Sequence, residues 1–345
     1  MKPVQKPLSG ILKAWRKFRK KGAQSLTDTV AEAESSPKGS TKYMTPIRFI
    51  AVVIFPVVLT LCLGLGAWNG VNLYRQVTAH MASLSSPTKK LIRYQFAVKN
   101  KGRAFARDIS INIFAPVSDY PMQRLDALSG PNGYEEKTDA ISNKTLIYKI
   151  DQLASYEARN ITINAELTML PLAPTKVDPK LWLKNERYIE VDSPEVREIA
   201  KLFEGLPLER QPKAVFDWLT QHLKPSDYIK EEKGAVWALE NKTGDCTEYT
   251  FAYVAILRKL GIPAIPLGGF IASRPATVIS GVDYHNWALF HDGRRWRLAD
   301  PLNGVFNQQE EDYVAFRVLS ESADGEPLGR SRFSVDDENV VIEMQ

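Results

Sequence analysis

The longest stretch of the 345-residue sequence without a charged residue runs from Phe49 to Tyr74. Its first 20 residues, up to Trp68, are almost wholly apolar. About 20 such residues span a bilayer as an α-helix, so we predict a transmembrane helix over residues 49–72. A buried helix of a soluble protein rarely runs this long without a charge, and the basic region before it is too long for a cleaved signal peptide.

Basic residues are concentrated ahead of this stretch. Residues 1–48 hold eleven Lys or Arg and three Asp or Glu, a net charge of +8, so the rest of the chain carries −3 of the total of +5. The positive-inside rule keeps such an end in the cytoplasm. We therefore expect a single-pass protein of a bacterial inner membrane, with residues 1–48 cytoplasmic and the C-terminal part periplasmic; a eukaryotic type II membrane protein would fit the same pattern. A negative exported part gives no sign of nucleic-acid binding.

Residues 88–172 contain short segments in which apolar and polar residues alternate. Such alternation is typical of β-strands with one buried face. The segments are Ile92–Val98, Ile109–Ile113, Leu146–Ile150 and Ile161–Leu167. We predict a small β-sandwich here, which would serve as a spacer or a binding domain.

A proline-rich boundary near residue 172 separates this region from the next. From residue 176 onward helical patterns come first and strand patterns follow, an order that predicts an α+β domain over residues 176–345. One helix is expected to run from Cys246 to Leu260, because Gly261 and Pro263 end it.

Cys246 stands at the start of that helix. Asp245 is a good N-cap residue, and Glu248 three positions later completes a capping box. The positive end of the helix dipole stabilises a thiolate, which is the nucleophilic form of cysteine. The only other cysteine, Cys62, lies in the predicted membrane span, so Cys246 has no disulfide partner in the exported part, and catalysis would explain it.

A predicted hairpin follows the helix. Asp292–Gly293 between two apolar runs is typical of a two-residue turn. Such a turn would place His285 directly opposite Asp300, with Cβ atoms about 5 Å apart on one face of the sheet. Together with Cys246, this pair follows the logic of a nucleophile, a base and an orienting carboxylate.

These residues resemble the transglutaminase-like superfamily, which has a papain-like Cys-His-Asp core. The resemblance lies within residues 186–316 and rests on three blocks in the expected order: Gly244–Cys246 with the helix end Leu257–Ala264, then His285–Trp287, then Trp296–Pro301. It implies that Cys246 is the nucleophile, His285 the base and Asp300 the residue that orients His285. Because the family includes cross-linking enzymes, deamidases, cysteine peptidases and inactive members, the resemblance leaves the substrate open.

We therefore expect a membrane-anchored thiol hydrolase or acyl transferase that acts on amide bonds of exported proteins, foremost a cysteine peptidase. A protein-glutamine transglutaminase or deamidase is the alternative of the same chemistry, and a catalytically silent binding or scaffold module is the alternative of another class. The expected partners are a protein or peptide substrate near the membrane and the bilayer itself, through residues 49–72. The backbone N–H of Cys246 and one side chain would hold the oxyanion, with Trp237 and Asn241 as candidates. No cofactor and no metal is expected.

Overall fold

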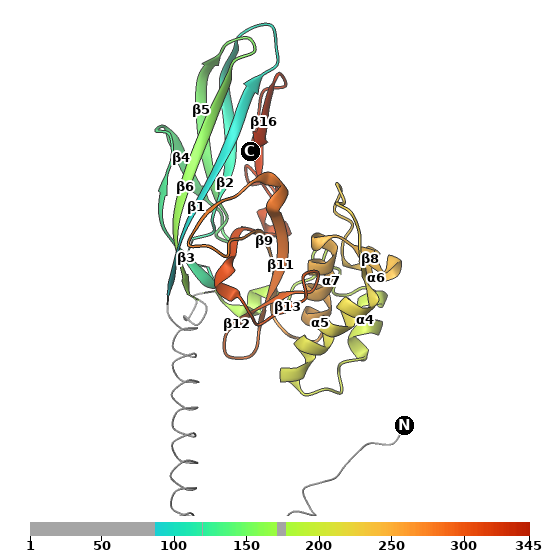
Figure 1. Ribbon diagram of the computed structural model, residues 1–345. Coiled ribbons are helices and arrows are strands. Elements are labelled where there is room, and N and C mark those ends of the chain that lie inside the picture. Colours follow the sequence, from blue (N-terminus) through green and yellow to red (C-terminus); the bar gives the residue numbers. More distant parts are fainter. Residues whose placement is uncertain (1–86, 119, 171–176) are drawn as a thin grey trace, which may run out of the picture. The chain divides into compact units, whose positions relative to one another are not determined.

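The computed structural model describes residues 87–118, 120–170 and 177–345 (Figure 1). These residues belong to one compact unit, Val77–Gln345. The predicted cytoplasmic segment, residues 1–48, and the predicted transmembrane helix, residues 49–72, lie outside the described residues. Within the described ranges, no helix is long and apolar enough to cross a membrane.

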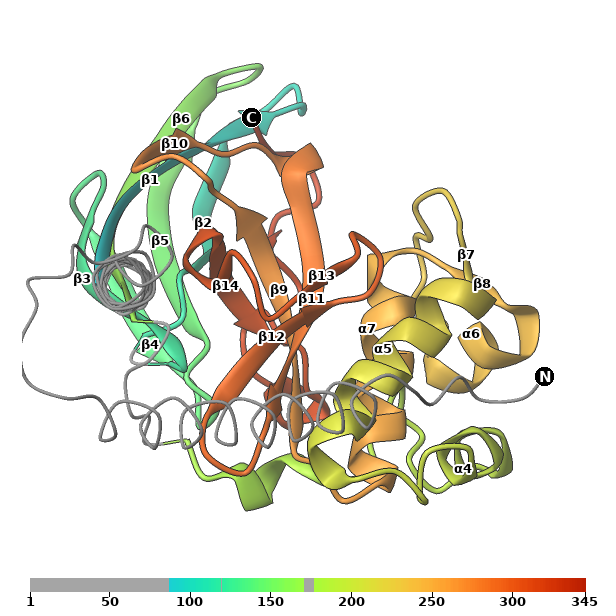
Figure 2. The same cartoon turned by 60° about the horizontal axis from the view of Figure 1, so that its bottom comes forward.

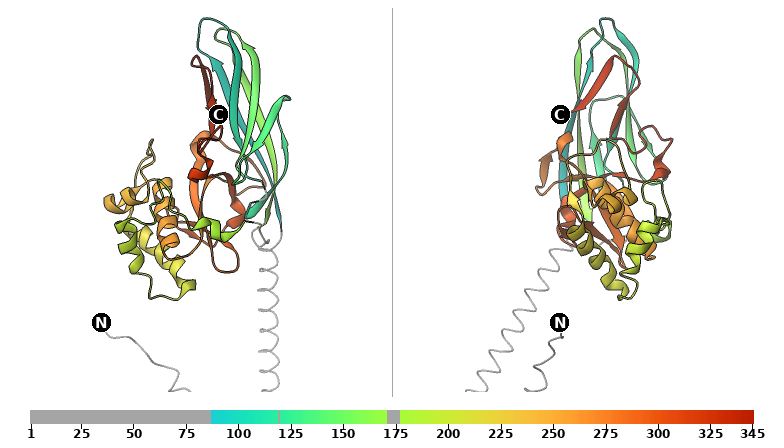
Figure 3. Two further views of the ribbon diagram at one scale, coloured as in Figure 1. Left: turned by 180° about the vertical axis from the view of Figure 1, so that it is seen from behind. Right: turned by 90° about the vertical axis from the view of Figure 1, so that its right-hand side faces the viewer.

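Six strands of the N-terminal half form the main part of two sheets that share one hydrophobic core (Figures 2 and 3). Along the first strand, the buried side chains of Ile92, Tyr94, Phe96 and Val98 alternate with more exposed neighbours, as the sequence pattern predicted. One sheet contains β1 (Thr88–Asn100), β6 (Ala158–Leu170) and β3 (Met122–Ser129), and the other contains β2 (Ala106–Ala115), β5 (Lys144–Leu153) and β4 (Tyr134–Thr138).

Three short strands from the C-terminal half complete these two sheets. β10 (Ala276–Val278) pairs with β1 in parallel, β16 (Val340–Met344) pairs with β1 antiparallel, and β15 (Phe333–Val335) pairs with β2. The sequence did not reveal β10 and β15, because three residues are too few to show an alternation. The chain after residue 176 thus returns to the sandwich, and the limits 88–172 and 176–345 stay a prediction.

A group of helices and an antiparallel sheet make up the rest of the unit (Figure 1). The long helix α7 (Cys246–Lys259) packs against strands β11 and β9 on one side and against three helices on the other. These helices are α4 (Pro194–Lys201), α5 (Gln211–His222) and α6 (Ala235–Asn241). The sheet has the order β13 (Val305–Phe306), β12 (Trp296–Asp300), β11 (Tyr284–His291), β9 (Ala264–Ile271) and β14 (Tyr313–Val318). A short parallel pair, β7 (Lys224–Pro225) and β8 (Thr243–Gly244), precedes α7.

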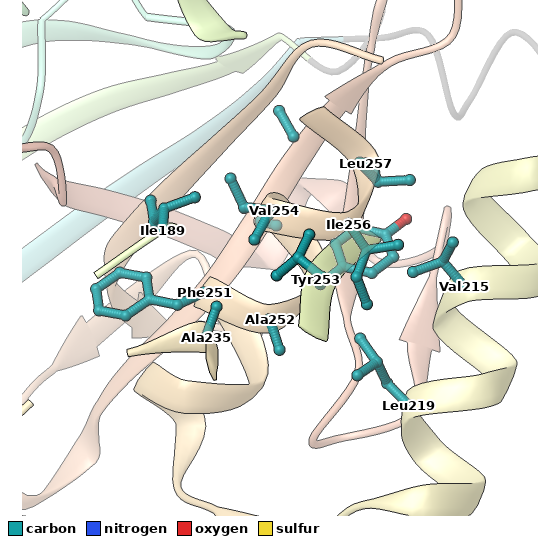
Figure 4. Close-up of a cluster of buried hydrophobic side chains, with 14 of the residues drawn as sticks. Ile189, Val215, Leu219, Ala235, Phe251, Ala252, Tyr253, Val254, Ile256 and Leu257 are labelled. Carbon is teal, nitrogen blue, oxygen red and sulfur yellow. The ribbon is translucent and has the colours of Figure 1, made fainter. Parts of the chain in front are cut away.

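Helix α7 is buried on all its sides from Glu248 to Arg258. A helix that is apolar around most of its circumference has to lie inside the protein. Figure 4 shows Tyr253 and Ile256 of α7 near Val215 of α5, within the shared apolar cluster. The helix runs as predicted from Cys246 and is followed by Gly261, whose φ of 77° suits a residue beyond a helix C-terminus.

The predicted two-residue turn of the hairpin is wrong. Strands β11 and β12 pair His291 with Trp296, so a loop of residues 292–295 joins them. The carboxylate of Asp292 accepts hydrogen bonds from the backbone N–H groups of Arg294 and Arg295, each at 2.9 Å, and this interaction stabilises the longer loop.

The longer loop moves the strands by two residues relative to the prediction. His285 is consequently not directly opposite Asp300. On the other side of β11, His285 pairs with Gly269 of β9. Side chains in a strand alternate between faces with a period of two, so a shift of two residues leaves each side chain on its predicted face. The predicted neighbourhood of His285 and Asp300 therefore survives the error in register.

Gly269 offers a test of this packing, because β9 lies between β11 and β14. A Cβ atom at Gly269 would lie 2.1 Å from the backbone oxygen of Val314. Overpacking of this kind costs about 1–3 kcal/mol or more. We therefore expect Gly269→Ala to lower the free energy of unfolding in urea by at least about 2 kcal/mol.

The matched control is Gly205→Ala, because no atom lies within 4 Å of a Cβ at Gly205. This variant should stay within about 0.5 kcal/mol of the wild type. Equal losses in the two variants would contradict the close approach of β14 to β9.

Candidate active site

Helix α7 begins at a cleft with a volume of about 1200 Å³, and Cys246 lies in its wall. The thiol is partly exposed and free. The other walls come from the loop of residues 228–232, from residues 324–332 ahead of β15, and from Gly281, Val282, Tyr284 and Asn286 around the start of β11. A nucleophile at this position can meet a substrate from solvent.

His285 links the cysteine to a buried carboxylate. Its Nε2 atom donates to Oδ2 of Asp300 over 2.7 Å. Cys246 is close enough to the ring to raise the pKa of His285. Because Nε2 faces Asp300, Nδ1 is the nitrogen left to face the thiol. The structure thus brings together the three residues that the sequence singled out, although their catalytic roles stay predictions.

The carboxylate of Asp300 is fully buried and accepts several hydrogen bonds. Besides His285, Oδ2 accepts from the hydroxyl of Tyr313 and from Nδ2 of Asn303, each at 2.9 Å. Oδ1 accepts from the backbone N–H of Asn303 at 3.2 Å. The oxygens of a buried carboxylate need such donors, and here the donors also fix the direction in which the carboxylate faces His285.

Sequence reasoning missed both Asn303 and Tyr313. Asn303 had a local signal, since an aspartate side chain commonly accepts from a backbone N–H two or three residues later in a turn. Tyr313 lies on β14 and reaches Asp300 only through the order of the strands, which no local pattern reveals.

The surroundings of His285 favour its charged form. Burial by itself lowers the pKa of His285, but the hydrogen bonds with Asp300 and Cys246, together with their charges, outweigh it and raise the pKa to about 9. Of its two forms, the imidazolium is therefore the one that this site favours.

The predicted capping box at the start of α7 is confirmed. Oδ1 of Asp245 accepts from the N–H of Thr247 at 2.8 Å, and Oε2 of Glu248 accepts from the N–H of Asp245 at 3.3 Å. The remaining carboxylate oxygens accept from the backbone of Ile229 at 2.9 Å and of Lys233 at 3.1 Å. The two caps therefore also hold the loop that forms one wall of the cleft.

Trp237 and Asn241, the candidate oxyanion donors, lie on α6 and are not among the residues that line the cleft. Nδ2 of Asn241 donates to the backbone oxygen of Trp237 at 2.8 Å. The oxyanion role stays a prediction for both. In the described part of the chain, no three His, Cys, Asp or Glu side chains gather as metal ligands would.

Comparison with known proteins places this site in a family. Residues 200–301, which include Cys246, His285 and Asp300, match the model of the transglutaminase-like superfamily. The chain therefore contains a transglutaminase-like domain, as its resemblance to the family implied. No curated protein matches the chain.

Solved structures extend the likeness to the fold. A protein from Cytophaga hutchinsonii, provisionally named a cysteine protease, aligns with a TM-score of 0.50 and 14% identity over 75% of this chain and 92% of that one. The periplasmic domain of TgpA from Pseudomonas aeruginosa aligns with a TM-score of 0.35 in two crystal structures, at 14% and 12% identity. These alignments cover 68% and 66% of this chain, and 96% and 92% of the TgpA chains. At 14% identity, the similarity to the Cytophaga hutchinsonii protein shows a shared fold alone.

The pKa of His285 leads to a test of its bond with Asp300. Asp300→Asn removes the negative charge that counteracts the effect of burial on His285. We therefore expect the pKa of His285 to fall from about 9 by more than about one unit. The measurement is a titration of the imidazole by NMR. His291, whose pKa is lowered by burial, serves as an internal control and should titrate equally in both proteins.

The same shift predicts how stability depends on pH. The pKa of His285 is raised from 6.5 when the protein is unfolded to about 9 when it is folded, so protonation favours the folded state. The stabilisation is complete below pH 6.5 and is lost as the pH rises through about 9. The difference in unfolding free energy between the wild type and Asp300→Asn should accordingly shrink over this interval; a difference that grows with pH would contradict the assigned direction.

Proposed function

We propose that this chain is a thiol hydrolase that cleaves amide bonds of exported proteins, acting as a cysteine peptidase. One observation carries the proposal: His285 is hydrogen-bonded to the buried carboxylate of Asp300 and is close enough to Cys246, in the wall of an open cleft, for that thiol to raise the pKa of His285. An idle site has no need for this arrangement. The transglutaminase-like domain supports the same chemistry.

The first step forms an acyl-enzyme. The thiolate of Cys246 bonds to the carbonyl carbon, and the backbone N–H of Cys246 at the start of α7 stabilises the oxyanion. His285 then donates its Nδ1 proton to the leaving amine while the C–N bond breaks. A thioester on Cys246 remains, and His285 is neutral.

The second step releases the acid. Neutral His285 takes a proton from a water molecule whose oxygen bonds to the thioester carbon. The C–S bond breaks, and the thiolate and the imidazolium are restored. Asp300 keeps the imidazole in one tautomer throughout, because Oδ2 accepts from Nε2 in both protonation states. If a lysine amine replaced water, the same site would be a transglutaminase; if the attacked amide were a glutamine side chain and water the acceptor, it would be a deamidase.

The proposed location follows from the sequence alone. Residues 1–48, with eleven Lys or Arg, would stay in the cytoplasm, and residues 49–72 would anchor the chain in a bacterial inner membrane. The site would then face the periplasm, and its substrates would be exported or neighbouring membrane proteins within reach of the bilayer.

The test uses the full chain with Cys62→Ser, so that Cys246 is its single thiol, and an unfolded protein substrate together with a fluorescent primary amine. We expect fragments with new N-termini, detected by mass spectrometry. Cys246→Ala should abolish them, and His285→Ala should lower the rate by about 10²–10⁴-fold because general acid–base catalysis is lost.

His291→Ala is the matched control, because this histidine lies at the end of β11 beside the hairpin loop and outside the cleft. Its rate should equal that of the wild type. Incorporation of the amine or release of ammonia without cleavage would instead identify a transglutaminase or a deamidase. No product of any kind, with iodoacetamide alkylating Cys246 no faster than a free thiol, would identify a silent binding module.

A further inference from the structure

Residues 324–332, which we call the strap, form the wall of the cleft that leads into β15. The sandwich holds the strap at two points. The backbone oxygen of Arg332 accepts from the N–H of Phe114 in β2 at 2.9 Å, and Glu326 forms an ion pair with Lys137 of β4 at 2.8 Å. The position of Arg332 beside the cleft is therefore fixed by its backbone.

The side chain of Arg332 is also held in place. Its Nη1 atom donates to the backbone oxygen of Gly281 at 2.9 Å. The central carbon of the guanidinium lies 4.9 Å from the ring centre of Tyr284 and 5.8 Å from that of Phe333. A cation held over aromatic faces and by a carbonyl is preorganised, so a ligand that binds it loses little additional conformational freedom.

Arg332 is distinguished from its neighbour Arg330 by its lack of a counter-charge. Arg330 forms ion pairs with Glu232 at 2.6 Å and with Asp324 at 3.6 Å. No carboxylate of the described residues forms an ion pair with Arg332. A guanidinium offers five N–H donors in a fork that matches a carboxylate, and most of those of Arg332 remain for a ligand.

Besides Glu232 and Asp324, three more carboxylates line the cleft, and each already interacts with a residue of the chain. Glu326 is paired with Lys137 at 2.8 Å, Glu231 lies 3.6 Å from Lys233, and Asp245 accepts from backbone N–H groups. The formal charge of the lining residues is negative, but these acids are neutralised or hydrogen-bonded by residues of the chain itself. Among the described residues of the cleft, Arg332 is thus a cation that is held in place and has no carboxylate partner. An anionic ligand could bind to it.

Arg332 and Cys246 line the same cleft. Tyr284 lines it as well, and the centre of its ring lies 4.9 Å from the guanidinium carbon of Arg332. A peptide that occupies this cleft at Cys246 can therefore present a nearby group to Arg332.

We infer that Arg332 binds a carboxylate of the substrate, so that the preferred substrates carry an acidic group close to the amide bond that Cys246 attacks. The inference rests on the proposed function and names its substrate class. The carboxylate would belong either to an acidic side chain or to the C-terminus of a peptide, because the guanidinium binds both in the same way.

Three alkylating probes test this inference without any need for turnover. Iodoacetyl-glutamine amide is neutral, iodoacetyl-glutamic acid α-amide has a side-chain carboxylate, and iodoacetyl-glutamine has a terminal carboxylate. Each forms a bond between its methylene carbon and the sulfur of Cys246 and releases iodide. The second-order rates are measured on the full chain with Cys62→Ser.

We expect one carboxylate probe to react at least about 10-fold faster than the neutral probe, as a charge-assisted hydrogen bond would give. The faster of the two identifies the source of the carboxylate. Arg332→Gln should remove this preference and leave the rate of the neutral probe unchanged. Arg332→Lys should keep part of it, because the charge remains and the planar fork is lost.

Lys230→Gln is the matched control, since it removes the same charge from an exposed lysine that also lines the cleft. It should change the preference less than about 2-fold, because surface charges are screened by solvent. Equal losses in Lys230→Gln and Arg332→Gln, or no preference in the wild type, would overturn the inference.

Failure of the proposed function would look different in the same experiment. All three probes would then react at the rate of a free thiol, with no change in His285→Ala. The ratio between charged and neutral probes reports on Arg332, whereas the absolute rate of the neutral probe reports on activation of Cys246.

Discussion

The structure depends on helix α7, which begins at the cleft and is buried from Glu248 to Arg258. The backbone N–H groups in the first turn of a buried helix cannot form hydrogen bonds with water. Each would carry a large free-energy cost if it lacked an acceptor. Asp245 and Glu248 supply the acceptors, and burial raises the pKa of Glu248 to about 7. Their other oxygens hold the backbone of Ile229 and Lys233. Two carboxylates thus fix the start of α7, the position of Cys246 and one wall of the cleft.

Features that depend on neighbouring residues could be predicted from the sequence. The capping box around Cys246 and the glycine that follows α7 are local, and the structure confirms both. The meeting of His285 and Asp300 was predicted with the wrong register and is nevertheless present. The face of a strand residue depends only on whether its position is odd or even, so this prediction tolerated a shift of two residues and would not have tolerated a shift of one.

Features that depend on the order of strands could not be predicted. The hydroxyl of Tyr313 donates to Asp300 because β9 and β11 bring β14 and β12 into one sheet, and the sequence contains no local trace of that order. Trp237 and Asn241 were chosen as oxyanion candidates because they are close to Cys246 in sequence, and that role stays a prediction.

The three short C-terminal strands explain how the sandwich contributes to the cleft. β15 pairs with β2 and β16 with β1, so the chain that leaves the catalytic sheet at β14 has to return to the sandwich. The strap is the segment that makes this return, and on its way it lines the same cleft as Cys246. Its end is fixed by a hydrogen bond from Phe114 of β2 to Arg332. A spacer domain would only hold the catalytic domain away from a membrane, whereas this sandwich anchors a charged side chain in the wall of the cleft. The inferred selection of substrates by Arg332 and the support of the fold would therefore depend on the same strands.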